Sequence, residues 1–317
     1  MAPSRCEIAL CICTYDRYDV LPKAVESVVR QSLGANRYEI LVIDNSPEPA
    51  RAFAFAAQFK SIANLRYVVE ERPGLSNARN IAAKIASAPI VAFMDDDAIA
   101  AEDWAEQILQ SFEAAGASTM IVGGRVDPIW AAPRPTWLHD TMLGSLSIVD
   151  WGGDIRIAEA KEWVAGTNMA FRATAILAHG GFSKNLGRIG SGAALLSNDE
   201  VELIARIRAA GGQLVYAPKA RVRHLVDAQR LRPAWFRKRA AWQALSDFMM
   251  EPDRMAEEAK SHWPELVKYF NAVPPLERTV RGLAFETDDP ELFRWQISAI
   301  YMLSILLLAG FEGVELG

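Results

Sequence analysis

Residues 89–97 read Pro-Ile-Val-Ala-Phe-Met-Asp-Asp-Asp, an apolar run that stops abruptly at three consecutive carboxylates. A short run that is rich in β-branched and aromatic residues, and bounded by proline and by charge, predicts a strand buried in a sheet. Asp95, Asp96 and Asp97 then lie at the C-terminal end of that strand. Open α/β sheets bind their ligands at this edge, so the stretch predicts an α/β fold with its site here.

The three acidic side chains are expected to bind a cation. Unpaired carboxylates about 5 Å apart repel one another by about 3 kcal/mol per pair at an effective dielectric of about 20. Side chains at positions i and i+2 of a strand project to the same side, so Asp95 and Asp97 are expected to converge on one ion while Asp96 points elsewhere. The alternative is a solvated loop, or the N-cap of a helix at residues 101–104, where carboxylates complement the helix dipole. Three carboxylates after a buried strand favour the metal site.

The composition excludes several classes of protein. The chain has 317 residues, of which 51% are apolar and 23% charged, so it is globular and long enough for one large α/β domain or a domain with an appendage. A net charge of −5 gives no reason to expect a nucleic-acid partner. Cys6, Cys11 and Cys13 crowd the first strand without a CxxC pair, which predicts buried free thiols and a reducing compartment. Charge precedes a short strand at the N-terminus in place of a signal-peptide apolar region, so secretion is not expected.

The rest of the first two thirds alternates between strand and helix patterns. Apolar runs predict buried strands over residues 8–13, 38–43 and 65–69, and helical spacing predicts helices over 21–31, 51–59 and 76–86, the last capped by Ser76. This alternation predicts a parallel sheet with right-handed crossovers. Beyond Asp97 the patterns predict helices over 102–114 and 199–210, strands over 119–126, 163–171, 213–216 and 220–224, and loops over 128–154 and 182–197.

The C-terminal third has a different character, and we place a domain boundary between residues 1–227 and 228–317. Residues 230–239 are basic with interleaved aromatic residues, which is consistent either with a helix packed on the catalytic domain or with contact to an anionic membrane surface. Residues 295–311 are strongly apolar but near the lower length limit for a membrane span. A buried helix or a homo-oligomer contact is favoured over a span.

The order of these pieces resembles the family 2 inverting glycosyltransferases with the GT-A fold, from about residue 6 to residue 226. One DxD is a weak signal, but seven elements in family order are a strong one. The resemblance implies a mostly parallel, Rossmann-like central sheet flanked by helices, with a helical C-terminal extension. The seven elements are Cys13-Thr14-Tyr15-Asp16-Arg17, Asp44-Asn45, Pro73-Gly74 through Ala78-Arg79-Asn80, Asp95-Asp96-Asp97, Gly166-Thr167-Asn168, Asp199-Glu200 and Val222-Arg223-His224.

The resemblance also implies roles for individual residues. The helix start usually reads Glu-Asp in this family, with the Asp as base. Here it reads Asp199-Glu200, which leaves the base open between the two, and alignment on Glu202-Leu203 puts Glu200 in the base position. His224 is either a metal or phosphate contact or a structural histidine. The remaining implied roles are a nucleoside pocket at Thr14, Tyr15, Arg17 and Asp44, a nucleotide contact at Arg79, ribose or sugar contacts at Asp95 and Asp96, and a metal site at Asp97 with Asp95.

The chemistry of glycosyl transfer fits these residue types. The departing diphosphate gains charge that Mn²⁺ or Mg²⁺ held by carboxylates stabilises. A carboxylate on the opposite face of the sugar accepts the acceptor's proton, and one base without an enzyme nucleophile implies inversion. We expect a nucleoside diphosphate sugar donor, UDP- or dTDP-linked, and a surface glycan or lipid-linked acceptor. We place the enzyme in the cytoplasm, at the inner face of the cell membrane. The alternatives are a sugar nucleotidyltransferase, whose Gly-rich phosphate loop is missing at Thr14-Tyr15-Asp16-Arg17, and a non-catalytic sugar-nucleotide binding protein, which needs no base.

Overall fold

The computed structural model describes residues 6–190 and 194–310, which form two compact units. The first unit takes in Met1–Ile129, Ser147–Ala193 and Asp199–Leu225, and the second takes in Trp130–Leu146, Ala194–Asn198 and Val226–Gly317. Two short segments that precede residue 226 therefore belong to the second unit. The domain boundary at residue 227 stays a prediction.

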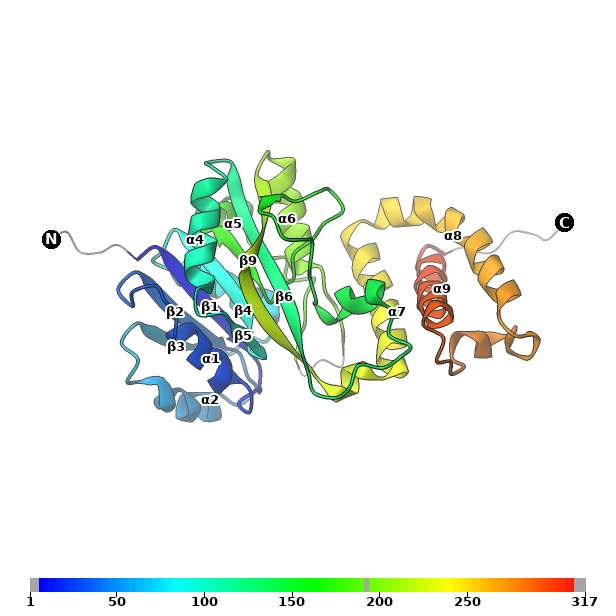
Figure 1. The fold of residues 1–317 in the computed structure, drawn as a ribbon, viewed down its shortest axis with the longest axis horizontal. Coiled ribbons are helices and arrows are strands. Elements are labelled where there is room, and N and C mark those ends of the chain that lie inside the picture. The colour runs from blue at the N-terminus through cyan, green and yellow to red at the C-terminus, as the bar shows by residue number, and fades with distance from the viewer. Residues whose placement is uncertain (1–5, 191–193, 311–317) are drawn as a thin grey trace. The chain divides into compact units, whose positions relative to one another are not determined.

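The first unit is built on one twisted sheet (Figure 1). Its strand order is β3-β2-β1-β4-β8-β6-β9-β5, and β7 pairs with β9. The first four strands of this order are parallel, whereas β8 runs antiparallel to both β4 and β6, and β5 and β7 run antiparallel to β9. The α/β class is confirmed, with a sheet that is mixed beyond β4. The strands are β1 (Ile8–Thr14), β2 (Tyr38–Asp44), β3 (Leu65–Val69), β4 (Ile90–Asp95), β5 (Ala98–Ala100), β6 (Thr119–Trp130), β7 (Arg156–Ile157), β8 (Met169–Arg172) and β9 (Gln213–Val226).

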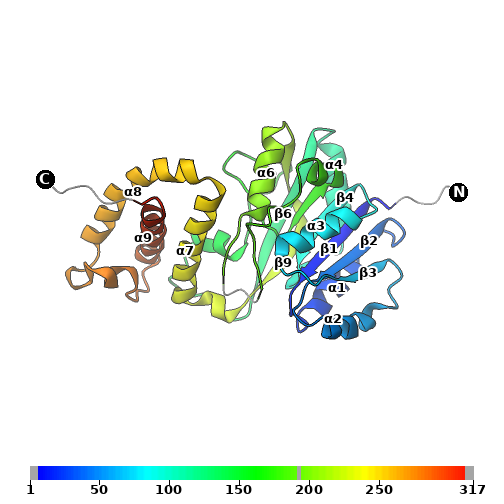
Figure 2. The same ribbon diagram turned by 180° about the vertical axis from the view of Figure 1, so that it is seen from behind.

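Helices cover both faces of the sheet (Figure 2). Because strand side chains alternate, Ile8, Leu10 and Ile12 of β1 join one core cluster while Ala9 and Cys11 join the other. The first cluster packs α1 (Leu21–Val29) and α4 (Trp104–Ala114), and the second packs α3 (Leu75–Ile85), α5 (Ala173–Ala178) and α6 (Asp199–Ala209). The helix α2 (Pro49–Ala56), followed by a 3₁₀ turn over Ala57–Phe59, leads to β3.

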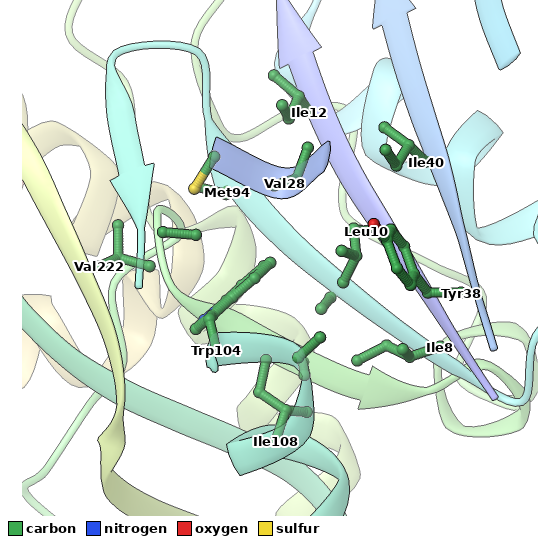
Figure 3. Packing of buried hydrophobic residues seen from close by; sticks show 14 of the residues in the cluster. Ile8, Leu10, Ile12, Val28, Tyr38, Ile40, Met94, Trp104, Ile108 and Val222 are labelled. Atoms are coloured by element: carbon green, nitrogen blue, oxygen red, sulfur yellow. The ribbon is translucent and has the colours of Figure 1, made fainter. Parts of the chain in front are cut away.

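Trp104 lies inside the first cluster near Met94, Ile108 and Val222 (Figure 3). Its side chain is fully buried, and its indole N–H donates to Asn168 Oδ1 at 2.8 Å. The Asn168 amide donates in turn to the carbonyls of Arg125 and Ala220. One asparagine thereby ties α4 to β6 and β9, which explains why a buried polar residue follows Gly166-Thr167.

The sequence patterns misplaced several local features. The predicted strand over 163–171 is β8 alone, because residues 165–168 form a turn. The two strands predicted over 213–216 and 220–224 are one strand, β9, and Pro218 within it does not break the pairing. The strand β5 was not predicted, because a strand of three residues is too short to show a periodic sequence pattern. Gly74, not Ser76, occupies the N-cap of α3, and the Ser76 hydroxyl donates to the Leu186 carbonyl.

The second unit is helical, as the sequence predicted. Its core includes Met255, Leu266 and Tyr269 of α8 together with Ala299 and Ile305 of α9. Within it, Phe236 and Arg237 of the basic aromatic stretch face inward: Phe236 packs against the rings of Trp137 and Phe293, and Arg237 donates to Gln296. Its helices are α7 (Pro233–Met250), α8 (Pro252–Ala272) and α9 (Pro290–Leu308), with 3₁₀ turns over Asp140–Leu146, Ala228–Leu231, Pro275–Glu277 and Val280–Leu283.

The helix α9 corresponds to the predicted apolar segment, whose last residue, Phe311, lies outside the described residues. It is the one helix among the described residues that is long and apolar enough to cross a membrane, and 28% of its apolar window is buried. Length and composition alone do not distinguish a span from a core helix or a surface contact. Of the three free cysteines, Cys11 is buried, whereas Cys6 and Cys13 are half-buried.

Candidate functional site

The site forms where three parallel strands end. The register of β1 pairs Thr14 with Asp44 of β2 and Cys13 with Asp95 of β4, so the polar residues that follow each strand meet at one edge. Tyr15 and Arg17 continue from β1 at the same edge. This is the arrangement that the apolar runs and their polar ends predicted.

Asp95 and Asp97 come together with His224. One potential ligand atom from each lies within 4.8 Å of the others. The strand β5 reverses the chain after Asp97 and pairs Ala98 with His224 of β9, which places the buried imidazole beside the acidic turn. His224 Nε2 lies 3.2 Å from Asp97 Oδ1, and Arg17 Nη2 lies 3.1 Å from Asp97 Oδ2. Two carboxylates and an imidazole are a donor set that suits Mn²⁺ or Mg²⁺, so these residues fit a divalent cation.

Asp96 turns away from its two neighbours. It is buried and accepts a hydrogen bond of 2.6 Å from the Thr14 hydroxyl. Burial, followed by the charge of Asp97, raises the pKa of Asp96 to about 8. Thr14 and Asp96 therefore hold each other at the strand ends.

Asp44 is completely buried and receives four hydrogen bonds from this chain's own donors. One oxygen accepts from the backbone N–H and the hydroxyl of Ser46, and the other accepts from the hydroxyls of Tyr18 at 3.0 Å and Tyr67 at 2.6 Å. The sequence reasoning did not select these two tyrosines. Tyr18 could have been found as the next aromatic residue after Arg17, but Tyr67 has no local signal.

Arg79 of α3 lies between Asp95, a candidate metal ligand, and the acidic start of α6. It is buried, and its guanidinium lies 2.7 Å from Asp199, 3.8 Å from Glu200 and 3.8 Å from Asp95. A side chain on Gly166 would place its Cβ 2.2 Å from Arg79 Nη2, so only glycine at this position lets the guanidinium lie where it does.

Asp199 and Glu200 have different surroundings. Asp199 is buried, pairs with Arg79 and accepts from the Ser76 hydroxyl at 3.2 Å, so its charge is compensated within the protein. The Glu200 side chain keeps 16% of its surface exposed, and its nearest cation is 3.8 Å away. Burial, followed by the charge of Asp199, raises the pKa of Glu200 to about 8. A carboxylate with a raised pKa that reaches solvent suits proton acceptance.

All of the predicted site residues lie at this edge of the first unit, and the sequence reasoning missed four more that contact or face them. These four are Tyr18, Tyr67, Ser76 and Arg188.

The family is established by comparison with known proteins. The family model described as glycosyl transferase family 2 matches residues 9–172. The chain is 27% identical over 248 residues to the glucosyl-dolichyl phosphate glucuronosyltransferase of Haloferax volcanii, covering 77% of each protein. It is 26% identical over 230 residues to the succinoglycan biosynthesis protein ExoM of Rhizobium meliloti, covering 72% of this chain and 70% of that protein.

Solved structures of glycosyltransferases share the fold. The mannosyltransferase PcManGT from Pyrobaculum calidifontis, in complex with GDP-Man and Mn²⁺, superposes with a TM-score of 0.56 at 18% identity, covering 98% of this chain and 76% of that one. TarS residues 1–349 from S. aureus, in complex with UDP, superpose with a TM-score of 0.50 at 13% identity, covering 94% of this chain and 90% of that one. Because the family match spans more than half of its length, this chain belongs to glycosyl transferase family 2 and has the GT-A fold.

Proposed function

We propose that this glycosyltransferase is metal-dependent and inverting, and that it transfers a sugar from a nucleoside diphosphate sugar to a hydroxyl of a surface glycan or lipid-linked precursor. The observation that carries the proposal is the position of Arg79. One guanidinium lies 3.8 Å from Asp95 of the metal-ligand group and 3.8 Å from Glu200, so the candidate metal ligands and the candidate base share one site.

In this proposal Asp95, Asp97 and His224 hold Mn²⁺ or Mg²⁺, which stabilises the charge that develops on the diphosphate. Thr14, Tyr15, Arg17 and Asp44, at the ends of β1 and β2, form the nucleoside side of the site. Asp95 and Asp96 contact the ribose or the transferred sugar. Arg79 lies near the nucleotide and keeps Asp199 paired.

Glu200 accepts the proton of the acceptor hydroxyl as its oxygen attacks the anomeric carbon. The new glycosidic bond forms on one face of that carbon while the bond to the diphosphate oxygen breaks on the other. The electron pair leaves with the nucleoside diphosphate, and Asp199 stays paired with Arg79. One displacement inverts the configuration, because no residue forms a covalent intermediate.

The names of the similar proteins support the donor and acceptor classes. The names of the solved structures mention GDP-Man and UDP, and those of the curated relatives mention a dolichyl phosphate glycan and succinoglycan. We place the enzyme in the cytoplasm at the membrane's inner face, where the partly buried α9 or the basic stretch over residues 230–239 makes peripheral contact. A flotation assay with anionic liposomes tests this contact. Recovery of all the protein in the soluble fraction as a monodisperse oligomer would favour an oligomer contact through the same region instead.

A test of the proposal measures nucleoside diphosphate release from UDP-, dTDP- and GDP-linked sugars, with Mn²⁺, with Mg²⁺ and with chelator. We expect release from one of these donor classes, its loss with chelator, and a loss of at least about 100-fold in Asp97→Asn. Asp154→Asn, an exposed acidic residue of the same unit, is the matched control and is expected to behave as wild type. Release that is unchanged by chelator and by Asp97→Asn would contradict the metal assignment.

A further inference from the structure

Arg188 is a cation at the site that no step above uses. It lies on the 183–190 loop, between Phe182 and the start of α6, and its side chain is half-buried. Its guanidinium interacts electrostatically with the carboxylates of Asp95, Asp97, Glu200 and Asp199. Its charge therefore acts on both the candidate metal ligands and the candidate base.

The backbone of the 183–190 loop is fixed against the start of α3. The Arg188 carbonyl accepts from the Leu75 N–H at 2.9 Å, and the Leu186 carbonyl accepts from the Ser76 hydroxyl at 2.9 Å. Gly187 has a φ of +82°, and a Cβ there would lie 2.8 Å from the Ser76 hydroxyl and 3.0 Å from the Asp199 carboxyl carbon. The loop is thus held close to Asp199, and the Arg188 side chain starts from a defined position.

The Arg188 guanidinium is close to these acids without pairing with one. Among the described residues it makes no hydrogen bond and has no carboxylate oxygen within 4.0 Å, in contrast with Arg79, which closes on Asp199 at 2.7 Å. Arg17 and His224 already contact Asp97. Partial burial costs a guanidinium some of its hydration, and Arg188 has no carboxylate partner in return, so its place in the site is explained best by an anion that arrives with a ligand.

We propose that Arg188 binds the diphosphate of the sugar donor and holds it as it leaves, an inference that rests on the function proposed above. The planar guanidinium would donate two parallel N–H bonds to phosphate oxygens. Its loop is held beside Asp199 by the start of α3, and its charge acts on Asp95 and Asp97, the candidate ligands of a cation that would bind the same diphosphate. Its positive charge also offsets the negative charge that the departing diphosphate gains. In this role Arg188 touches the leaving group and determines affinity for phosphate rather than for the nucleoside.

The test compares ligands that differ only in their phosphates. Calorimetry measures binding of UDP, GDP and dTDP, each beside its nucleoside, to wild type and to Arg188→Gln in the presence of Mn²⁺. We expect Arg188→Gln to lose about 10- to 100-fold in affinity for the diphosphate that wild type binds, with nucleoside affinity unchanged, and Arg188→Lys to recover part of the loss. Lys184→Gln removes the same charge from an exposed position on the same loop and is expected to bind as wild type.

Three results would overturn the inference. If Arg188→Gln lost affinity equally for the nucleoside and the diphosphate, Arg188 would be a structural residue. If its diphosphate affinity were unchanged, Arg188 would not contact the diphosphate. An equal loss of diphosphate affinity in Lys184→Gln would show that the effect comes from net charge alone. A wild type that binds none of the three diphosphates would refute the proposed function together with this inference, whereas the three results above leave that function standing.

Discussion

Replacing Glu200 and Asp199 one at a time separates the base from the residue that supports it. The two carboxylates are adjacent in the chain, but Asp199 is the one that pairs with buried Arg79, at 2.7 Å, while Glu200 lies 3.8 Å from it. We therefore expect Glu200→Gln to act on the rate and Asp199→Asn to act on the stability. Each side chain keeps its size in its variant, so the comparison isolates charge.

The expected magnitudes follow from these surroundings. Loss of a general base lowers the transfer rate by about 10²–10⁴-fold with donor affinity kept. Asp199→Asn leaves the Arg79 charge buried with only longer contacts to Asp95 and Glu200, which costs about 3 kcal/mol and lowers Tm by on the order of 10 °C. Its transfer rate, measured well below Tm, is expected to fall less than that of Glu200→Gln.

The pH dependence of kcat/KM and of stability tests the assignment of Glu200 independently. Burial and the charge of Asp199 raise the pKa of Glu200 to about 8, and a base acts only when deprotonated. Wild-type kcat/KM is therefore expected to rise with pH through about 8, and Glu200→Gln is expected to keep only the pH dependence that comes from Asp96, whose pKa is also raised to about 8. The raised pKa also makes folding stability depend on pH: the unfolded chain releases the Glu200 proton near pH 4.5 and the folded chain near pH 8. The stability of wild type relative to the variant is therefore expected to fall between about pH 4.5 and about 8, and to stay constant outside that range.

The assay combines single-turnover transfer, donor calorimetry and thermal unfolding followed by circular dichroism at several pH values. The assignment is refuted if Glu200→Gln keeps wild-type turnover while Asp199→Asn loses it at an unchanged Tm, which would make Asp199 the base. If both variants stay active, neither residue is the base and the proton is accepted elsewhere.

Two further predictions concern the support of the site. In Gly166→Ala the new Cβ would lie 2.2 Å from Arg79 Nη2, so we expect a Tm lower by several degrees and a loss of transfer, whereas Gly153→Ala, which meets nothing within 4 Å, serves as its control; equal Tm values in the two variants would contradict this. Trp104→Phe removes the bond to Asn168 and part of a fully buried ring, so urea unfolding should show a loss of about 1–3 kcal/mol, and an unchanged midpoint would show that Asn168 holds β6 and β9 without it.

Much of the site follows from local sequence patterns. An apolar run that ends in Asp95, Asp96 and Asp97 identifies a buried strand and the edge at which it ends. The period of two along a strand separates Asp96 from its neighbours, and in the structure Asp96 bonds Thr14 while Asp95 and Asp97 lie beside His224. These features depend on residues within a few positions of one another.

Other features depend on contacts between distant segments and have no local signal. The three residues of β5 form a strand only because β9 lies beside them. The pairing of Tyr67 with Asp44 requires β3 to lie next to β2, and Arg188 reaches the site only because its loop is bound to the start of α3. A local sequence pattern does not reveal such a contact, because the contact depends on two segments that are distant in the sequence.

The order of Asp199 and Glu200 shows how tertiary contacts assign function to adjacent residues. Sequence alignment left the base open because the acidic pair reads Asp199-Glu200 here, the reverse of the usual Glu-Asp order. Arg79 gives the two acids different surroundings, since it approaches from α3, 120 residues earlier, and Gly166 leaves room for it beside Asp199. Once Asp199 is held in that ion pair, its charge raises the pKa of Glu200 while Glu200 keeps its access to solvent. The residue that pairs with Arg79 thereby also raises the pKa of its neighbour, so under the proposed function we expect an exchange of the two acids to lower the transfer rate.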